Sequence, residues 1–269
     1  MLERPDHNCG PMPAQRHSAR LATSHEATRQ RASAVLVTGA SGGIGRAISL
    51  AFAASGWYVG VHYLQNKAGA EATRRAVIQV GGTGDLYQAD IRMKQDVQQM
   101  VETYIRTVMT PSVFVCSAGV ATSRLLVRQP EEEWAQILAT NLTGTFHCLR
   151  AMADPLIAQR EGAIVVVGSY AGFHGSTGQA VYAASKAGLV GLVKTAAQEW
   201  GPYNVRVNLV LPGWQQTGLS AGAMPESAKW TDHALRRPPA LDEVARTIFH
   251  LAQLKDVSGQ VWNCDSRDL

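Results

Sequence analysis

Short, uninterrupted apolar runs recur along the chain from Ala34 onward, and longer amphipathic stretches separate them. A strand that is apolar at every position must be covered on both faces, which is typical of parallel sheets. Repeated strand–helix units of this kind predict a doubly wound α/β fold, in which helices cover both faces of a parallel sheet. The pattern continues without a second change of composition, so we expect one domain over residues 34–269.

The expected elements follow from the spacing of the apolar residues. The expected strands are 34–37, 58–62, 85–89, 112–116, 163–168, 205–210 and 259–263. The expected helices run from the first glycine turn to residue 55 and over 67–80, 94–109, 131–159, 180–200 and 241–253. One long helix is expected over 131–159, because Pro130 precedes it and three acidic residues favour its positive N-terminal end.

The N-terminal segment 1–33 differs from the rest of the chain in composition. It holds five arginines and three acidic residues, and its net charge of +2 (five minus three) is half of the formal charge of +4. It shows no clear apolar period, so we expect a disordered extension. The rest of the chain has no Lys/Arg cluster with interleaved aromatics, so no nucleic-acid partner is expected.

The cysteines and the apolar runs bear on the compartment. The four cysteines form no CxxC pair, which indicates free thiols in a reducing cytoplasm. No run approaches the roughly 18 apolar residues of a spanning helix, and no secretory signal is apparent, so we expect a cytoplasmic protein without a membrane partner. His7, Cys9 and His17 lack the spacing of a metal site, so no metal is expected.

A glycine-rich turn separates the first expected strand from the first expected helix and reads Thr38-Gly39-Ala40-Ser41-Gly42-Gly43-Ile44-Gly45. Glycines at this place let the backbone approach a pyrophosphate, while the N–H groups and positive dipole end of the next helix face the phosphate oxygens. A tight structural turn would give the same letters. The position between a strand and a helix, at the start of the domain, favours dinucleotide binding.

A tyrosine and a lysine, Tyr182 and Lys186, are four residues apart at the start of an expected helix and therefore share one face. A tyrosine has a pKa near 10, and a neighbouring cation lowers it by stabilising the phenolate. A shift to about 7 needs roughly 4 kcal/mol of differential stabilisation. The pair predicts an acid/base group, although a solvated Tyr/Lys pair on a helix surface would have the same spacing.

Two further polar residues belong to this pattern. Ser169 follows the fifth expected strand, thirteen positions before Tyr182 (182 − 169). The carboxyl edge of a parallel sheet is where doubly wound folds bind ligands, so the Ser169 hydroxyl can hold a substrate oxygen. Asn141 lies within the expected long helix, where an ordinary helical asparagine is the alternative interpretation.

Together these residues resemble the short-chain dehydrogenase/reductase family, over about residues 34–266. The glycine turn has that family's Thr-Gly-x-x-x-Gly-x-Gly form, and Asn141, Ser169, Tyr182 and Lys186 match its catalytic tetrad in order and spacing. The resemblance implies a Rossmann fold and hydride transfer between a nicotinamide cofactor and a ketone or secondary alcohol. It implies that Tyr182 is the acid/base, that Lys186 lowers its pKa and holds the ribose, and that Asn141 anchors a water of the proton relay.

The resemblance also implies cofactor contacts after successive strands. Besides Tyr182 and Lys186, these are Gly39, Ser41, Gly43, Ile44, Gly45, Tyr63, Asn66, Asp90, Ile91, Ala118, Gly119, Pro212, Gly213 and Thr217. Tyr63 takes the place of the acidic residue that binds the ribose 2′-hydroxyl in many NAD-dependent folds. A missing carboxylate removes repulsion against a 2′-phosphate, so NADP(H) is favoured over NAD(H), although Gly42 replaces an arginine that many NADP-dependent relatives carry.

Two stretches depart from the family pattern. Cys116-Ser117-Ala118-Gly119 replaces the usual Asn-Asn-Ala-Gly after the fourth strand, and Asp265-Ser266-Arg267 replaces the usual Asp-Gly-Gly near the last strand. Residues 214–240 form the variable segment that covers the substrate in relatives; a packed surface loop is the alternative. The segment contains Trp214, Met224, Pro225, Trp230, Pro238 and Pro239.

The substrate is predicted from finer similarities. The glycines before Tyr182 and the segment 237–245 resemble those of 3-oxoacyl-[acyl-carrier-protein] reductases, and Arg160 matches a position that docks the acidic carrier protein. Tyr203 stands where a second basic docking residue is usual. We therefore expect reduction of a 3-oxoacyl thioester, with acyl-carrier protein as a possible partner. Alternatives are another alcohol, sugar or cyclic ketone, or a non-catalytic dinucleotide-sensing protein.

Small residues along the helix that carries Tyr182 bear on assembly. They are Ala183, Ala187, Gly191 and Ala197. Small side chains let two helices approach closely, and relatives pack this helix and the preceding one into dimers and tetramers. The resemblance therefore implies a homotetramer or homodimer.

Overall fold

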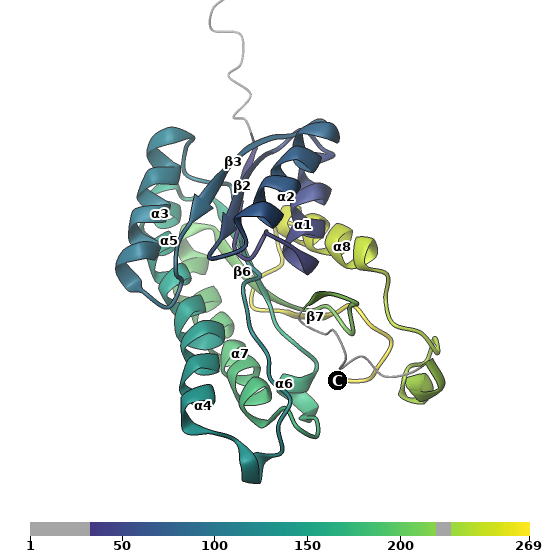
Figure 1. Cartoon of the computed structure of the whole chain (residues 1–269). Helices are drawn as coiled ribbons and strands as arrows, with labels where there is room; N and C mark the ends of the chain where they lie inside the picture. The colour runs from purple at the N-terminus through teal and green to yellow at the C-terminus, as the bar shows by residue number, and fades with distance from the viewer. Residues whose placement is uncertain (1–32, 219–226) are drawn as a thin grey trace, which may run out of the picture. The chain divides into compact units, whose positions relative to one another are not determined.

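Seven strands form one parallel sheet in the order β3-β2-β1-β4-β5-β6-β7 (Figure 1). This computed structural model describes residues 33–218 and 227–269. The strands are β1 Ala34–Val37, β2 Tyr58–Tyr63, β3 Thr83–Gln88, β4 Val113–Cys116, β5 Gly162–Val167, β6 Val205–Leu211 and β7 Val261–Asn263. The expected extension 1–33 lies, except for Ser33, outside the described residues.

The longer connections between strands contain the helices. They are α1 Gly43–Ala53, α2 Lys67–Gln79, α3 Lys94–Thr107, α4 Glu131–Leu138, α5 Gly144–Gln159, α6 Ala171–His174, α7 Ala180–Trp200 and α8 Leu241–Gln253. A π-helical turn, η2 Ala139–Thr143, joins α4 to α5, and short 3-10 turns include η5 Ser227–Asp232. No helix among the described residues is long and apolar enough to cross a membrane.

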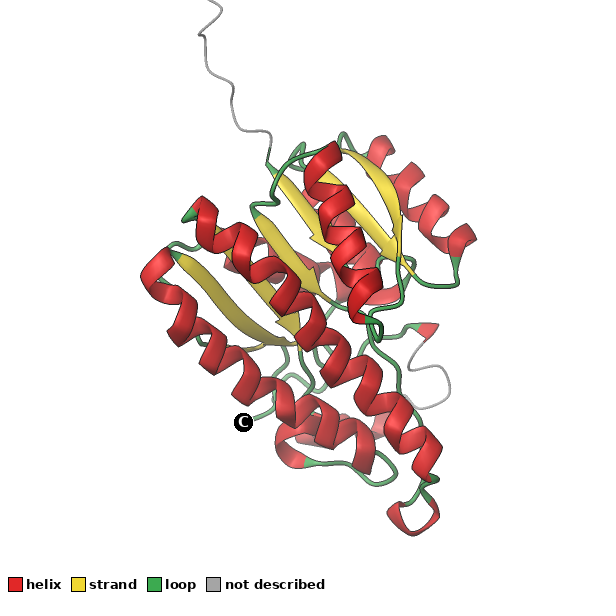
Figure 2. Ribbon diagram, turned by 90° about the vertical axis from the view of Figure 1, so that its left-hand side faces the viewer, coloured by secondary structure: helices red, strands yellow, loops and turns green. Residues whose placement is uncertain are grey.

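Both faces of the sheet are covered, as Figure 2 shows for the strands and the helices before and behind them. Alternate residues of β1 point to opposite faces: Val35 and Val37 pack in the core under α1, α2 and α8, and Leu36 packs in the core under α3, α5 and α7. Every residue of β1 is fully buried for this reason. The doubly wound parallel sheet, a Rossmann fold, is confirmed.

Most ends of the elements differ from the expected ones by one or two residues, and three of the differences have a physical reason. The strand β3 starts at Thr83, two residues earlier than expected, because its paired β2 partner Tyr58 extends the ladder. The expected long helix is wrong as a single element, since η2 interrupts it. The short helix α6 was not expected, because four residues give no apolar period to detect.

The strand order places the reversal of the chain path between β1 and β4. In doubly wound folds, ligands bind outside the carboxyl ends of the strands at this point. The glycine-rich turn follows β1, and residues 117–120 follow β4, so both segments meet there.

Candidate active site

The glycine-rich turn is held between two neighbouring strands. Gly39 has a φ of 66°, a conformation that glycine adopts readily, and a Cβ added to it would lie 2.7 Å from Cα of Ala118. On that side, the Thr38 hydroxyl accepts hydrogen bonds from the backbone N–H of Ser117 (3.0 Å) and of Ala118 (3.2 Å). The turn therefore packs directly against the segment after β4, although that segment lacks the family's asparagines.

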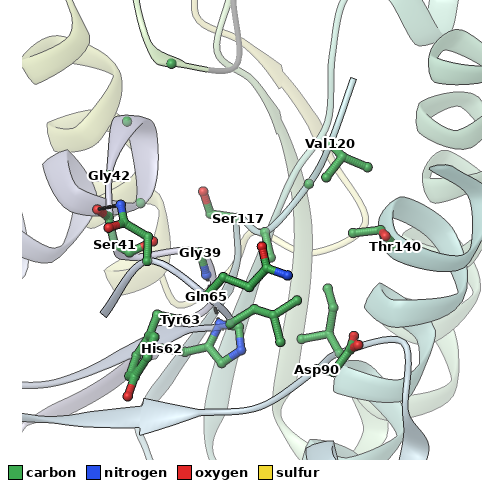
Figure 3. A pocket seen from close by; sticks show the side chains of 18 of the residues that line it. Gly39, Ser41, Gly42, His62, Tyr63, Gln65, Asp90, Ser117, Val120 and Thr140 are labelled. Carbon is green, nitrogen blue, oxygen red and sulfur yellow. Dashed lines mark hydrogen bonds between the residues drawn. The ribbon is translucent and has the colours of Figure 1, made fainter. Parts of the chain in front are cut away.

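A pocket of about 490 Å³ lies over the turn (Figure 3). Ser41 lies on one side of it, and Asp90 and Thr140 lie on the other. The sequence-predicted residues that line it are Gly39, Ser41, Gly43, Ile44, Gly45, Tyr63, Asn66, Asp90, Ile91, Ala118, Gly119 and Thr217. The first N–H groups of α1 have no carbonyl partner within the helix, so they are available to an anion. The glycine cradle, the helix start and the pocket fit a dinucleotide.

The pocket over the glycine-rich turn has few charges. Asp90 is its one carboxylate among the described residues, and the Arg92 guanidinium binds it, with 2.9 Å between Nε and Oδ1. This contact lowers the pKa of Asp90. Asn66 caps α2 by accepting the N–H of Gly69 (2.9 Å), and its neighbour Lys67 does not line the pocket.

A second pocket, of about 520 Å³, adjoins the first and shares Ile44, Ser117, Gly119 and Thr217 with it. The predicted residues Ser169, Tyr182, Lys186, Pro212 and Gly213 all line it. Ser169 reaches it from the end of β5, and the tyrosine and lysine reach it from the first turns of α7. The shared residues place this polar group beside the dinucleotide pocket.

Burial controls the protonation of Tyr182. Desolvation raises its pKa above the ordinary value, and a hydrogen bond with Ser169 lowers it by less. The Lys186 Nζ lies 5.8 Å from the centre of the Tyr182 ring, and a lowering of the phenol pKa by this ammonium stays a prediction. The phenol is therefore kept protonated at neutral pH.

Lys186 is only 6% exposed, and its Nζ donates a hydrogen bond to the carbonyl of Val167 at 2.8 Å. Burial lowers its pKa to about 8, because an ammonium loses hydration in the interior. The lysine thus points toward the end of β5, next to Ser169.

Asn141 lies in η2 and is fully buried, and it lines neither pocket. Its amide nitrogen donates to the Val120 carbonyl (2.9 Å) and to the Ser185 hydroxyl (3.0 Å), and its amide oxygen accepts the Val120 N–H (2.8 Å). Its backbone carbonyl accepts the Thr145 hydroxyl at 2.7 Å. The side chain therefore fixes the segment after β4.

Residues near the C-terminus form a wall of the second pocket that the sequence did not predict. The Arg267 guanidinium lies 3.8 Å from the centre of the Tyr170 ring, and both residues line the pocket. Its Nε donates to Oδ2 of Asp265 at 3.0 Å. Asp265 in turn contacts the Pro-Gly turn, since a Cβ added to Gly213 would lie 2.8 Å from Cβ of Asp265. The altered Asp-Ser-Arg sequence was the one available signal.

The segment expected to cover the substrate is described in part. Trp214 and Asp232 line the second pocket, and the buried Trp230 packs edge-on against His233 with ring centres 4.9 Å apart. Met224 and Pro225 lie outside the described residues. The described parts of the segment thus combine pocket lining with ordinary packing.

Comparisons with known proteins agree with this geometry. Residues 33–227 match the family model described as short chain dehydrogenase. A 3-oxoacyl-[acyl-carrier-protein] reductase of Synechocystis sp. is 36% identical over 241 residues, 88% of this chain and 97% of the relative. A protein of the same name from Staphylococcus epidermidis is 35% identical over 232 residues, 84% of this chain and 94% of the relative. The chain is therefore an oxidoreductase that uses a nicotinamide dinucleotide, and it belongs to the short-chain dehydrogenase/reductase family.

Proposed function

We propose that the protein reduces a 3-oxoacyl thioester to the 3-hydroxyacyl thioester with NADPH. The observation that carries this proposal is the convergence of Ser169, Tyr182 and Lys186 on one pocket that adjoins the dinucleotide pocket. The relatives support the substrate class. Both are named 3-oxoacyl-[acyl-carrier-protein] reductase, and the alignments cover most of their length.

Each residue has a proposed task in this reaction. When bound, the cofactor supplies the hydride. Ser169 holds the carbonyl oxygen by a hydrogen bond, and Tyr182 donates its proton to that oxygen. A phenol whose pKa is raised by burial is protonated at neutral pH, which suits the direction of reduction. Lys186 supplies positive charge beside the phenol, and Asn141 acts indirectly by fixing the Val120 segment.

The preference for NADP(H) over NAD(H) rests on charge. The pocket has a single carboxylate among its described residues, Asp90, and Arg92 neutralises it. Ser41 and Asn66 line the same pocket and offer polar groups near the end of β2. A 2′-phosphate therefore meets no unpaired carboxylate of the described chain there.

Docking of an acidic carrier protein on Arg160 has a geometric consequence. Arg160 precedes β5 and Ser169 follows it, and a strand of six residues spans about 20 Å. The two residues therefore lie at opposite edges of the sheet. A carrier protein on Arg160 would deliver its thioester to the site of another copy, so this mode of delivery requires an oligomer.

A homodimer or homotetramer is proposed through the outer face of α5 and α7. An open groove there is lined by Leu142, Thr143, Phe146, Gly188, Gly191, Leu192 and Thr195. Phe146 is 47% exposed in the single chain. The small glycines allow the close helix approach that the sequence predicts.

One observation favours a second candidate, a polar alcohol or sugar as substrate. Besides the catalytic residues, the second pocket is lined by polar side chains that include Ser123, Ser176, Gln179, Asp232 and Arg267. These groups can bind hydroxyls as well as a thioester. A substrate panel separates the two candidates.

The test is reduction of acetoacetyl-CoA, of acetoacetyl-carrier protein and of a panel of sugars and cyclic ketones, each with NADPH and NADH. We expect the thioesters with NADPH to give the highest kcat/KM, and the carrier-protein reaction to weaken with salt. Tyr182→Phe should lower kcat by roughly 10²- to 10⁴-fold. Tyr170→Phe, which removes a hydroxyl from the same pocket, is the matched control. Unchanged turnover in Tyr182→Phe would refute the site assignment.

A further inference from the structure

His62 occupies the next-to-last position of β2, directly beside the glycine-rich turn (Figure 3). It is 2% exposed and is the polar residue in an otherwise apolar stretch, Val59-Gly60-Val61-His62. Neither the family pattern nor the proposed catalytic chemistry gives it a task. Its two hydrogen-bond partners, Gly39 and Ala89, however, both line the pocket over the glycine-rich turn.

Both ring nitrogens of His62 have backbone partners. Nδ1 lies 3.0 Å from the backbone nitrogen of Gly39, and Nε2 lies 3.1 Å from the carbonyl oxygen of Ala89. A backbone N–H can only donate and a carbonyl can only accept, so Nδ1 must be the acceptor and Nε2 must carry the proton. The contacts therefore require the neutral ring. Burial supports this, because it lowers the pKa of His62 to about 4.

The same residue holds the turn a second time through its backbone. The N–H of Ala40 donates to the carbonyl of His62 at 2.9 Å. Two consecutive N–H groups of the turn, those of Gly39 and Ala40, are thus bound by one residue of β2. On the opposite side, the Thr38 hydroxyl binds the segment after β4. Movement of the turn is restrained from both neighbouring strands.

We propose that His62 is a positioning residue for the cofactor: its Nδ1 holds the N–H of Gly39 and so keeps the glycine-rich turn in the shape that receives the dinucleotide phosphates. The Nε2 bond to Ala89 serves this end by fixing the tautomer and the ring orientation. Loss of the Nδ1 acceptor leaves the half-buried N–H of Gly39 without its partner, and the turn shifts to pair it elsewhere. The proposal depends on dinucleotide binding and not on which ketone is reduced.

Two amide substitutions separate the two bonds of the ring. In His62→Asn, the side-chain oxygen falls near the position of Nδ1 and can still accept the N–H of Gly39. In His62→Gln, the amide nitrogen reaches the position of Nε2 and can still donate to the Ala89 carbonyl, but the acceptor for the Gly39 N–H is lost. A role limited to joining β2 to β3 predicts that the Gln variant is the better replacement; the proposed role predicts the Asn variant.

The readout is the Kd of NADPH and of NADH, measured by calorimetry without any ketone. We expect His62→Asn to stay within about threefold of the natural protein and His62→Gln to bind at least about tenfold more weakly. Equal affinity of His62→Gln and the natural protein, or equal weakness of both variants, would overturn the proposal. Failure of ketone reduction would leave this result unaffected.

If the variants do not fold, nitrogen NMR of the histidines in the natural protein tests the proposal through the protonation of each ring nitrogen of His62. The expected result is an unprotonated Nδ1 and a protonated Nε2 on His62 at pH 7, both unchanged when NADPH saturates the protein. A protonated Nδ1, or a change of tautomer on binding, would show that Gly39 is not held by this ring and would overturn the proposal.

Discussion

Arg267 lies over the ring of Tyr170, with 3.8 Å between its guanidinium carbon and the ring centre, although 97 positions separate the two residues (267 − 170). The contact joins the end of the chain to the segment that follows Ser169. It also orients the guanidinium toward Asp265, whose side chain is fully buried against the Pro-Gly turn. The C-terminal residues therefore help to shape the second pocket.

Replacement of Arg267 by methionine should destabilise the protein, because it leaves the buried Asp265 carboxylate without its cation. We expect the free energy of unfolding to fall by roughly 3 kcal/mol, measured by urea denaturation. The double variant Arg267→Met/Asp265→Asn should recover most of this loss, since no buried charge remains. Equal losses in the single and double variants would contradict the pairing.

Replacement of Lys186 by methionine should abolish turnover and yet stabilise the fold. The folded pKa of about 8 is below the ordinary value of 10.5, so the folded state must hold an unfavourable charge at pH 7. Above pH 10.5 the lysine is neutral in both the folded and the unfolded state, and burial carries no charge penalty. The penalty grows as the pH falls from 10.5 and is complete once the pH is below about 8, where the folded state also binds the proton. At pH 7 the variant should gain about 2–3 kcal/mol over the natural protein.

The pH dependence provides the check on this prediction. The gain of Lys186→Met in thermal unfolding should shrink as the pH rises from 8 to 10, because the natural lysine then loses its charge. Lys194→Met, on the exposed side of the same helix, is the matched control and should change little at either pH. In the natural protein, kcat/KM should fall as the pH rises through about 8, since the ammonium beside Tyr182 is lost.

Alanine substitutions in the glycine-rich turn should be damaging at Gly39 and tolerated at Gly42. Gly39→Ala introduces a Cβ 2.7 Å from Cα of Ala118 at a φ of 66°, so we expect a loss of roughly 1–3 kcal/mol in stability and much weaker NADPH binding. Gly42→Ala places its Cβ with no atom within 4 Å in an extended conformation and should be tolerated. Comparable damage from both substitutions, in calorimetry, would refute the packing argument.

A charge placed on the outer face of α7 should dissociate the proposed oligomer. A Cβ added to Gly191 has no neighbour within 4 Å in the single chain, so Gly191→Glu should fold normally and yet block a facing copy. Sedimentation should then give a species of 28.9 kDa. Ser55→Glu, an equal charge change beyond α1 on the other side of the sheet, should leave the oligomer intact. A natural protein that already sediments as one chain would refute the oligomer.

Most of the fold follows from the sequence, because its signals are local. Continuous apolar strands such as Val35–Val37 have to be covered on both faces, and this alone requires helices on both sides of the sheet. The start and end of α7 and of α8 were predicted correctly for the same reason. The limits of β3 were not, because its residues alternate between buried and exposed at the edge of the sheet.

The site was predictable where the family pattern reaches and not elsewhere. Tyr182 and Lys186 are four residues apart on one helix, so their common placement needs no tertiary information. His62 binds Gly39 and Ala89, which are 23 and 27 positions away, and the contacts exist only because β1, β2 and β3 are neighbours. The pKa of Tyr182 also depends on burial by distant segments, so its direction could not be read from the spacing of two residues.

The π-helical turn at Asn141 has a consequence for the phase of the helix around it. One surplus residue in such a turn offsets the two halves by about 100° of rotation relative to a regular α-helix. Deleting a single residue within 139–143 would restore regularity, but it would swing α4 about its axis and carry the asparagine away from Val120. The π-helical turn thus allows α5 to pack its buried side chains in the core while Asn141 still binds Val120 in the loop beyond β4.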